Sequence, residues 1–486
     1  MALSFVQKPQ DVNNDIPFIT NWTPLLGFML HQDASIAAFY YYKMVLEIRK
    51  DDASGELLAK LKQRRNGYSQ DGADDEARAF FDIRGIVNSV LVNTVFDQNC
   101  TGTPFQSIHT LGSNTGHTDK VFSHNGDRNT DETQVQTIYV KGYQQYAESA
   151  NAIPEEVTTG SQNYTARYMQ GSLPLMTPRG TANFILDPTP LEVFQGSSDT
   201  DRFLSDVATS TDSQYNITGY INYVQETDYH TIAFLNDEGN FDSEIHKIRT
   251  VFYNSAGALL NLDTVDNDTD EGGLPPDDGG LEDETRLLYF GCGPANLEAQ
   301  TIGTFSNAKP SNNSGWAYYT VQGRNSANSA NKTAKYYFIK QDGNCKGHKV
   351  RRLAWRNSMG CYDYFNFKMK STQNLKIERN NYNTMLGTFN KSRWRYDDTQ
   401  RGKTTRQTKA TLTETLNTDW LNEQQAELIE KLIYSTDVYI VENADTDYTE
   451  GVVLTDSNFI RKTIANDKLI QYTITIEYAN PINTNS

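Results

Sequence analysis

Residues 353–378, LAWRNSMGCYDYFNFKMKSTQNLKIE, decide how the fold of this chain is interpreted. Within thirteen positions this stretch holds Trp355, Tyr362, Tyr364, Phe365 and Phe367. The Ser-Met-Gly at 358–360 interrupts two apolar runs and predicts a turn. After the turn, large apolar side chains occur at both even and odd positions, so both faces of the strand are apolar. Such a strand is usually covered on both faces. We therefore predict the central strand of the C-terminal part, and an aromatic core in preference to a ligand-stacking role.

The composition favours strands and polar loops over helices. Only 37% of the 486 residues are apolar, but 28 Tyr and 22 Phe can bury large areas. Tyr, Phe, Thr and Asn are abundant and there are only 14 Pro. We expect a mainly β, multi-domain protein with a few short helices and antiparallel, sandwich- or barrel-like sheets.

The charge argues against nucleic acid as a partner. The net charge is −17, whereas a nucleic-acid binder normally needs a basic patch that neutralises phosphates. One basic run, residues 391–409, contains Trp394 and Tyr396. A stacking platform for single strands is one interpretation of it, but we favour a solvated loop or a charge-complementary subunit contact.

Cysteine usage and the apolar runs bear on the compartment. The four cysteines are widely separated and show no paired spacing: Cys100, Cys292, Cys345 and Cys361. We expect no disulfide scaffold and assembly in a reducing compartment. The first residues lack the pattern of a signal peptide. No apolar run is long enough to predict a membrane span.

The first hundred residues predict a small sheet with one helix. An irregular arm (1–35) precedes a strand at 39–49, a turn at 51–55 and a return strand at 57–62. Asp82 is placed to cap a following helix. The apolar stripe of that helix is Ile83, Ile86, Val87, Val90 and Leu91. We expect residues 1–100 to be an N-terminal assembly domain.

Residues 101–345 predict a polar, β-rich middle domain inserted between the two ends. Its candidate strands are 136–140, 164–169, 220–224, 231–235, 247–253, 286–290, 316–321 and 336–339. Many short strands joined by polar loops favour a sandwich or barrel. Residues 263–285 form a low-complexity acidic loop.

Residues 346–486 predict a C-terminal α+β assembly domain that packs on the N-terminal one. A weak alternation at 408–416 precedes a helix that Asn422 caps, with Gln425 reaching back. The buried stripe of this helix is Ala426, Ile429, Leu432 and Ile433. Strands follow at 438–441, 452–454 and 468–479. The last strand alternates most clearly and is expected to be antiparallel.

Candidate metal sites are weak. The first ligand positions of a helix-loop-helix calcium site have the spacing of Asp266, Asp268 and Asp270. However, the Gly and Glu that such a site requires are replaced by Glu271 and Asp277. A solvated acidic loop is the preferred interpretation. Cys345, His348 and Cys361 include one Cys-x-x-His and lack the second pair of a zinc site. The histidines His109, His117 and His124 match no metal-site spacing.

Catalytic motifs are absent too. We find no G-x-S-x-G, phosphate-binding loop or dinucleotide fingerprint. Asp228 and Asp363 lie among tyrosines, as sugar-cleaving acids do, but this signal is faint. We therefore expect no enzyme, no cofactor, and no catalytic, cofactor-binding or metal-binding residue.

The two ends of the chain resemble virion structural proteins of tailed bacteriophages. The N-terminal segments that carry the resemblance are FYYYKMVLEIR, LLAKLK and FDIRGIVNSVL. The C-terminal ones are LAWRNSMGCYDYFNF, LTETLNTDWLNEQQAELIEKLIYSTDVYIVE and NDKLIQYTITIEYAN. The resemblance covers about the first hundred and the last 135 residues.

This resemblance implies a subunit of the tail, baseplate or neck, assembled in the bacterial cytoplasm and located in the virion. Its partners would be copies of itself, closing into a homo-oligomeric ring, and neighbouring virion proteins. The alternative is a receptor-binding module whose middle region recognises a host glycan, with Trp316, Tyr318 and Tyr319 stacking on sugars. A polysaccharide depolymerase is a third, weaker class.

Overall fold

The computed structural model describes residues 3–8, 18–19, 27–32, 39–64, 77–91, 96–97, 106–107, 122–124, 135–169, 171, 198–237, 245–266, 285–300, 302–341, 347–396, 399–441, 449–455, 470–480 and 482–485. The protein is mainly β, with several antiparallel sheets and few short helices, which confirms the predicted fold class. Contacts group the chain into two units. The first is Met1–Gln341, Arg356–Asp363 and Asn443–Asp445, and the second is Asp342–Trp355, Tyr364–Glu442 and Thr446–Ser486.

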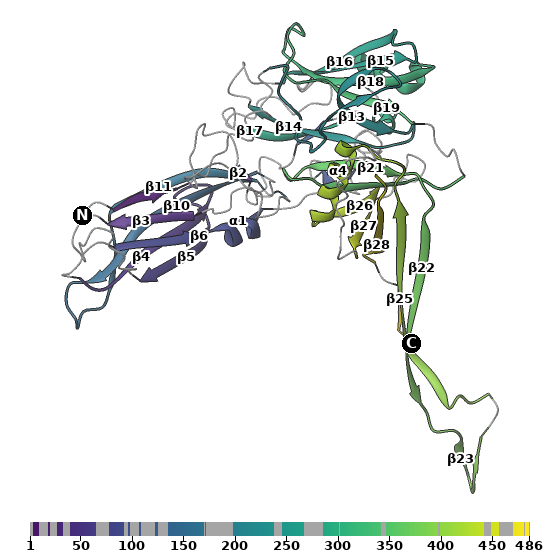
Figure 1. Cartoon of the computed structure of the whole chain (residues 1–486). Helices are drawn as coiled ribbons and strands as arrows, with labels where there is room; N and C mark the ends of the chain where they lie inside the picture. The colour runs from purple at the N-terminus through teal and green to yellow at the C-terminus, as the bar shows by residue number, and fades with distance from the viewer. Residues whose placement is uncertain are drawn as a thin grey trace. The chain divides into compact units, whose positions relative to one another are not determined.

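A five-stranded sheet dominates the N-terminal part of the first unit (Figure 1). Across the sheet, its strands are β2 (Phe18–Ile19), β11 (Glu155–Met169), β10 (Val135–Ala147), β4 (Tyr40–Lys50) and β5 (Leu57–Arg64). The hairpin of β4 and β5 confirms the predicted strand, turn and return strand. Strand β4 lies in the predicted N-terminal domain (1–100) and β10 in the predicted middle domain (101–345). These two strands pair directly, so one sheet contains strands from both ranges. The predicted three-part division stays a prediction.

A second, three-stranded sheet and one helix share a hydrophobic core with this sheet. Its strands are β1 (Leu3–Gln7), β3 (Gly27–Gln32) and β6 (Ala77–Asp82). Helix α1 (Arg84–Val90) follows β6, and its predicted stripe lies in or against the core. The predicted capping by Asp82 is wrong, because Ile83 occupies the N-cap position and no side chain caps the helix. The Asp82 carboxylate does accept the Arg84 N–H, at 3.0 Å. A short pair, β7 (Phe96–Asp97) and β8 (Gln106–Ser107), comes next.

The middle of the chain contributes two sheets to the first unit. The larger is ordered β12 (Thr209–Asp212), β13 (Ile217–Val224), β19 (Tyr336–Lys340), β18 (Trp316–Arg324), β15 (Lys247–Asn254) and β16 (Leu259–Asp266). The smaller is ordered β14 (Thr231–Asp237), β17 (Thr285–Gly291) and β9 (Phe122–His124). One buried cluster draws side chains from both sheets and from helix α3 (Pro294–Ala299). All eight strands predicted for this region are confirmed.

The second unit is built on one sheet. Its strand order is β21 (Tyr362–Phe367), β20 (Arg351–Arg356), β26 (Val438–Val441), β27 (Thr449–Leu454), β28 (Thr473–Tyr478), β25 (Lys403–Asn417) and β22 (Thr372–Asn383). Strand β29 (Ile482–Asn485) also pairs with β25. Helix α4 (Glu423–Tyr434) begins with the predicted capping box between Asn422 and Gln425.

Two predictions for this sheet need correction. Strand β21 is buried on both faces, as predicted, but lies at an edge of its sheet and not at its centre. Burial by covering side chains and position in the hydrogen-bonded order are separate properties, and the sequence reports only the first. The final strand is antiparallel as predicted, but it spans Thr473–Tyr478, and Ile470 forms only an isolated bridge with Leu421.

Candidate interaction surface

The most exposed part of the second unit is a long hairpin of residues 372–417, which we call the arm. It consists of β22, a small tip hairpin of β23 (Thr388–Asn390) and β24 (Arg393–Arg395), and β25. Strands β22 and β25 pair from Thr372–Thr415 to Asn383–Lys403. Every residue of β22 is exposed. Figure 1 shows the two strands running out of the sheet to the tip.

The sequence of the arm explains why it forms strands without a core. Strand β25 carries Thr at six positions, and β-branched residues favour extended backbone. Polar residues occupy both faces of β22, so neither face demands burial along its whole length. The tip turns at Lys391, whose φ of 54° lies in the left-handed region used by tight hairpin turns. The basic run at 391–409, predicted to be a solvated loop or a subunit contact, therefore includes strand β24 and the first half of β25, and its described residues are exposed or partly exposed.

The tip is held in a defined conformation. The Gly387 N–H donates to the Gln400 side chain at 2.7 Å, and the Thr384 N–H donates to the Gly402 carbonyl at 2.8 Å. Gly387 has a φ of +94°, and a Cβ there would lie 2.5 Å from Trp394 Nε1. The indole thus packs closely against the glycine backbone. These contacts give the tip a defined conformation.

Large apolar side chains are unusually exposed on this arm. The most exposed are Met385 at 78%, and Phe389 and Tyr396 at 69% each. The others are Leu375, Ile377, Tyr382, Leu386 and Trp394. Clustered exposed apolar groups mark interaction sites more often than isolated ones do, and an open edge strand such as β22 is a template for contact with another chain.

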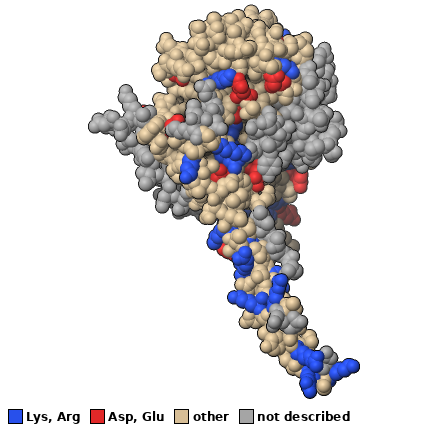
Figure 2. Space-filling view, turned by 90° about the vertical axis from the view of Figure 1, so that its right-hand side faces the viewer, with Lys and Arg blue, Asp and Glu red and all other residues tan. Residues whose placement is uncertain are grey.

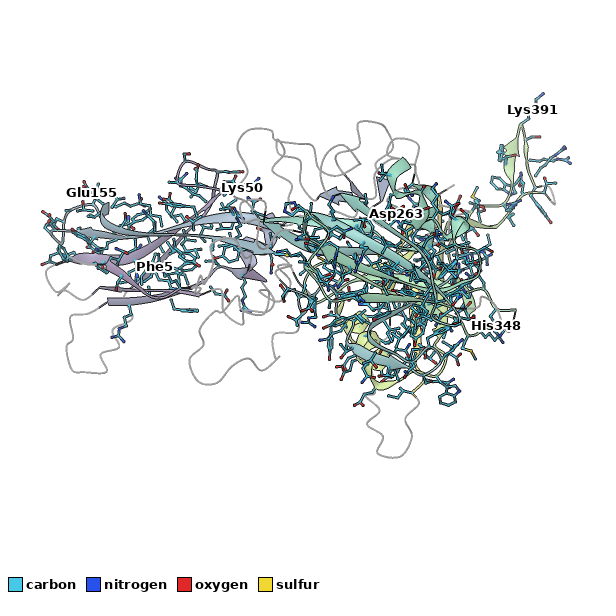
Figure 3. All side chains as sticks on the ribbon, turned by 90° about the horizontal axis from the view of Figure 1, so that it is seen from above. Phe5, Lys50, Glu155, Asp263, His348 and Lys391 are labelled. Atoms are coloured by element: carbon cyan, nitrogen blue, oxygen red, sulfur yellow. The ribbon has the colours of Figure 1, made fainter. Side chains whose placement is uncertain are left out.

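The arm also differs in charge from the rest of the chain. It contains nine Lys and Arg against four Asp and Glu, a net of +5. The remaining residues carry 35 against 57, a net of −22. Figure 2 shows Lys and Arg gathered along the narrow extension, and Figure 3 shows Lys391 at its far end. The arm is therefore a basic and apolar projection of an acidic protein.

A buried carboxylate holds the base of the arm. Glu414 of β25 accepts hydrogen bonds from Arg351 Nε at 3.0 Å, Tyr478 at 2.7 Å and Gln373 at 3.1 Å. Burial by itself would raise the pKa of Glu414, but these bonds, that from Arg351 first, outweigh it and lower the pKa. Gln373 belongs to β22, so the network joins both arm strands to β20 and β28.

The two carboxylates suspected of sugar chemistry are both buried and hydrogen-bonded within the protein. Asp228 is buried, and its carboxylate accepts the Gln225 N–H at 2.8 Å. Asp363 is buried and accepts bonds from Ser205 Oγ at 2.6 Å and the Asp206 N–H at 2.8 Å. Burial first, and then the Asp206 charge, raises the pKa of Asp363 to about 7.

Asp206 fixes the turn that precedes Asp363. Its carboxylate accepts the Ser358 N–H at 2.7 Å and also bonds the Ser358 hydroxyl. Asn357 accepts the Met359 and Cys361 N–H groups at 3.0 Å each. Gly360 completes this turn with a φ of 85°, which confirms the predicted turn at 358–360.

The aromatic residues proposed to stack on sugars are not available for that role. Strand β18 is buried along its whole length, and the exposed fractions of Trp316, Tyr318 and Tyr319 are 4%, 8% and 0%. Tyr319 stacks on Phe252 and Phe338 instead. The prediction that these rings face solvent is wrong, because an unbroken apolar run does not show which side of a strand is exposed.

The other suspected sites give no metal centre within the described ranges. Cys100, His109, His117, Cys345 and the acidic residues 268–277 lie outside them. Cys361 is buried, and burial raises the pKa of its thiol. Across the residues with a described position, no three His, Cys, Asp or Glu side chains gather around a common point. The helices among them include none with the length and apolarity to cross a membrane.

A second surface feature lies in the first unit, beside the start of β4. A groove of about 850 Å³ is lined by Tyr41, Lys43, Arg64 and Ile153, among others. Tyr41 has a φ of 57° and donates its hydroxyl to the Ala150 carbonyl at 3.0 Å. Lys43 and Arg64 are direct cross-strand neighbours, an arrangement of like charges that costs free energy.

Comparison with known proteins adds no relative. No protein-family model matches the sequence, and none of the curated proteins searched matches it either. The arm is thus interpreted from its own chemistry. Sequence reasoning found its basic residues, Trp394 and Tyr396, but missed the exposed Leu375, Ile377 and Met385. The signal for Leu375 and Ile377 was their alternation with polar residues along 372–383, whereas Met385 lies beyond that segment.

Proposed function

We propose that this protein is a structural subunit of a bacteriophage virion, belonging to the tail, baseplate or head–tail junction. It acts by self-assembly and by contacts with neighbouring virion proteins. The observation that carries this proposal is the arm, an ordered hairpin whose apolar side chains stand uncovered in the isolated chain. A subunit that functions alone would expose these groups at a cost in solubility.

Two further features support the proposal. The segments that resemble virion proteins coincide with regular elements: β4, β5, α1, β20, β21, α4 and β28. The most distinctive polar cluster of the first unit, around Asp206 and Asp363, serves a buried turn, which is a structural role.

Virion membership is testable on particles. Particles propagated from the genome that encodes this chain should contain it at a fixed ratio to the other structural proteins by mass spectrometry. Antibodies against the chain should label the tail or the head–tail junction in electron micrographs. A chain present in the lysate and missing from purified particles would contradict the proposal.

Host-glycan binding is the second candidate, and the groove beside Tyr41 favours it. Exposed tyrosine rings can stack on sugars, and Lys43 with Arg64 would attract acidic ones. Binding of the intact chain to an array of acidic bacterial glycans, lost in Tyr41→Ala together with Arg64→Ala, would support this function. Absence of binding to any glycan on the array would contradict this second function.

A further inference from the structure

We infer that the arm binds the acidic body of a second copy of this chain, in a heterologous contact of arm on body. This inference rests on the proposed self-assembly and names the surfaces involved. The body here means all residues outside 372–417. The arm supplies basic and apolar groups, and the neighbouring body supplies the opposite charge.

Charge complementarity selects the second copy as the occupant. The arm carries a net +5 and the body a net −22. Oppositely charged surfaces steer association and fix the register of a complex. Every copy carries both surfaces, so a population of identical chains supplies donor and acceptor at once.

The same charges exclude contact between two arms. A two-fold contact centred on the arms would place one arm against another, and each carries a net +5. Like charges brought together oppose binding. Arm-on-body contact instead joins two different surfaces, and repetition of such a contact closes into a ring or extends into a filament.

The apolar groups favour a protein surface over nucleic acid. Trp394 and Tyr396 could stack on bases, but Met385, Leu386 and Ile377 have no such partner on a phosphate backbone. Exposed aromatic, Met and Arg residues are the types enriched in the centres of protein interfaces.

A shortened arm tests the inference. Residues 381–406 are replaced by Asn-Gly, which joins Asn380 to Gln407. These two residues already pair across β22 and β25, and Asn-Gly is suited to a two-residue hairpin loop. The base network around Glu414 is kept. The replacement removes six basic and two acidic residues and the whole tip.

The measurement is a pull-down, in which a tagged chain captures an untagged chain and each has either the full-length or the shortened arm. Tagged full-length chain should capture untagged shortened chain, because the shortened chain keeps its acceptor body. Tagged shortened chain should capture no shortened chain. Capture should weaken as NaCl is raised, because screening reduces the attraction between exposed charges.

A matched pair of charge variants sharpens the test. Arg395→Glu in the tip should weaken capture about two- to fivefold, the change expected for an exposed ion pair. Lys335→Glu is the control, an exposed basic residue outside the arm, and should leave capture within about twofold of the original chain. Circular dichroism and thermal melting check that both variants are folded.

Four results would overturn the inference. The full-length chain could capture only full-length chain, which indicates arm-on-arm contact. It could remain monomeric throughout a concentration series, or shortened chains could associate as well as full-length ones. Binding of single-stranded DNA that disappears with the tip, without capture, would assign the arm to nucleic acid. Virion membership is decided separately on particles, so either proposal can fail while the other stands.

Discussion

The hairpin of β20 and β21 and the arm of β22 and β25 follow one another in the sequence and belong to the same sheet, yet they differ completely in burial. All residues of β20 and nearly all of β21 are buried, whereas every residue of β22 is exposed. Strands β21 and β22 occupy opposite edges of the sheet. Edge position therefore does not decide exposure in this protein.

The side chains decide it. The first hairpin presents aromatic rings at both parities, and covering both faces removes large apolar areas from water. The arm is mostly Thr, Asn, Lys and Arg, and its apolar residues are too few to form a core. It cannot support a core of its own, and its apolar residues gain burial only from another molecule. The first hairpin thus contributes to a buried core, whereas the arm leaves its apolar side chains exposed.

The largest expected difference between the two hairpins is in tryptophan replacement. Trp355→Ala should lower the free energy of unfolding by about 3–5 kcal/mol, because a fully buried ring leaves a cavity. Trp394→Ala, in the arm, should change it by less than about 0.5 kcal/mol, since the ring is 46% exposed. Chemical denaturation of both variants checks this. Equal losses would show that the arm is part of the stability core.

The second comparison replaces a carboxylate at the base and one on the shaft of the arm. Glu414→Ala should cost about 2 kcal/mol, because it removes a buried acceptor of three hydrogen bonds. Glu378→Ala, which breaks an exposed pair with Lys376, should leave the melting temperature unchanged. Both variants replace Glu by Ala, so they differ only in the surroundings of the carboxylate. A melting temperature that falls equally in both would contradict the assigned anchor.

The third prediction concerns pH and the turn of the buried hairpin. The pKa of Asp363 is raised from 3.8 to about 7, so the folded state holds this proton more tightly than the unfolded state. Its contribution to stability is therefore largest below about pH 4 and is lost as pH rises through about 7. The Asp363→Asn variant should show a weaker dependence of stability on pH. At pH 8, where the carboxylate of the original chain is ionised beside Asp206, the variant should gain stability relative to the original chain.

Melting temperatures of the original chain and Asp363→Asn across this pH range provide the measurement. Glu414→Gln serves as the control of opposite sign. The lowered pKa of Glu414 gives stability that is present at neutral pH and is lost as pH falls through the acidic range. Parallel pH profiles for the original chain and Asp363→Asn would refute the assignment.

The smallest expected effect on stability is at the tip of the arm. Gly387→Ala should open the tip, because the added Cβ would meet Trp394 Nε1 at 2.5 Å and the Arg395 carbonyl at 2.8 Å. The free energy of unfolding should change by less than about 0.5 kcal/mol, since the site is far from a core. The indole N–H signal of Trp394 in NMR spectra should shift. Gly402→Ala is the control, because a Cβ there would lie at ordinary contact distances of at least 3.4 Å from Leu386. An unshifted indole signal in Gly387→Ala would contradict the packing of Trp394 against Gly387.

The sequence by itself determined the local elements. Asn422 and Gln425 predicted the capping box, the eight strands of the middle region were found, and 358–360 predicted the turn. Each of these depends on interactions between residues near in sequence, or on periodicity within one element. The mainly β class followed from the same local preferences.

The residue pattern indicates that β21 needs covering, but only the tertiary structure decided what covers each strand and where the strand lies in its sheet. Strand β18 is buried along its whole length and β21 lies at an edge, and neither property is encoded in local periodicity. Residues far apart in the chain form the contacts between Glu414 and Arg351 and between Asp206 and Asp363. The exposure of Met385 likewise depends on which residues surround it in the folded chain. The physical reason is that burial is a property of the surroundings, whereas a residue pattern describes only the strand itself.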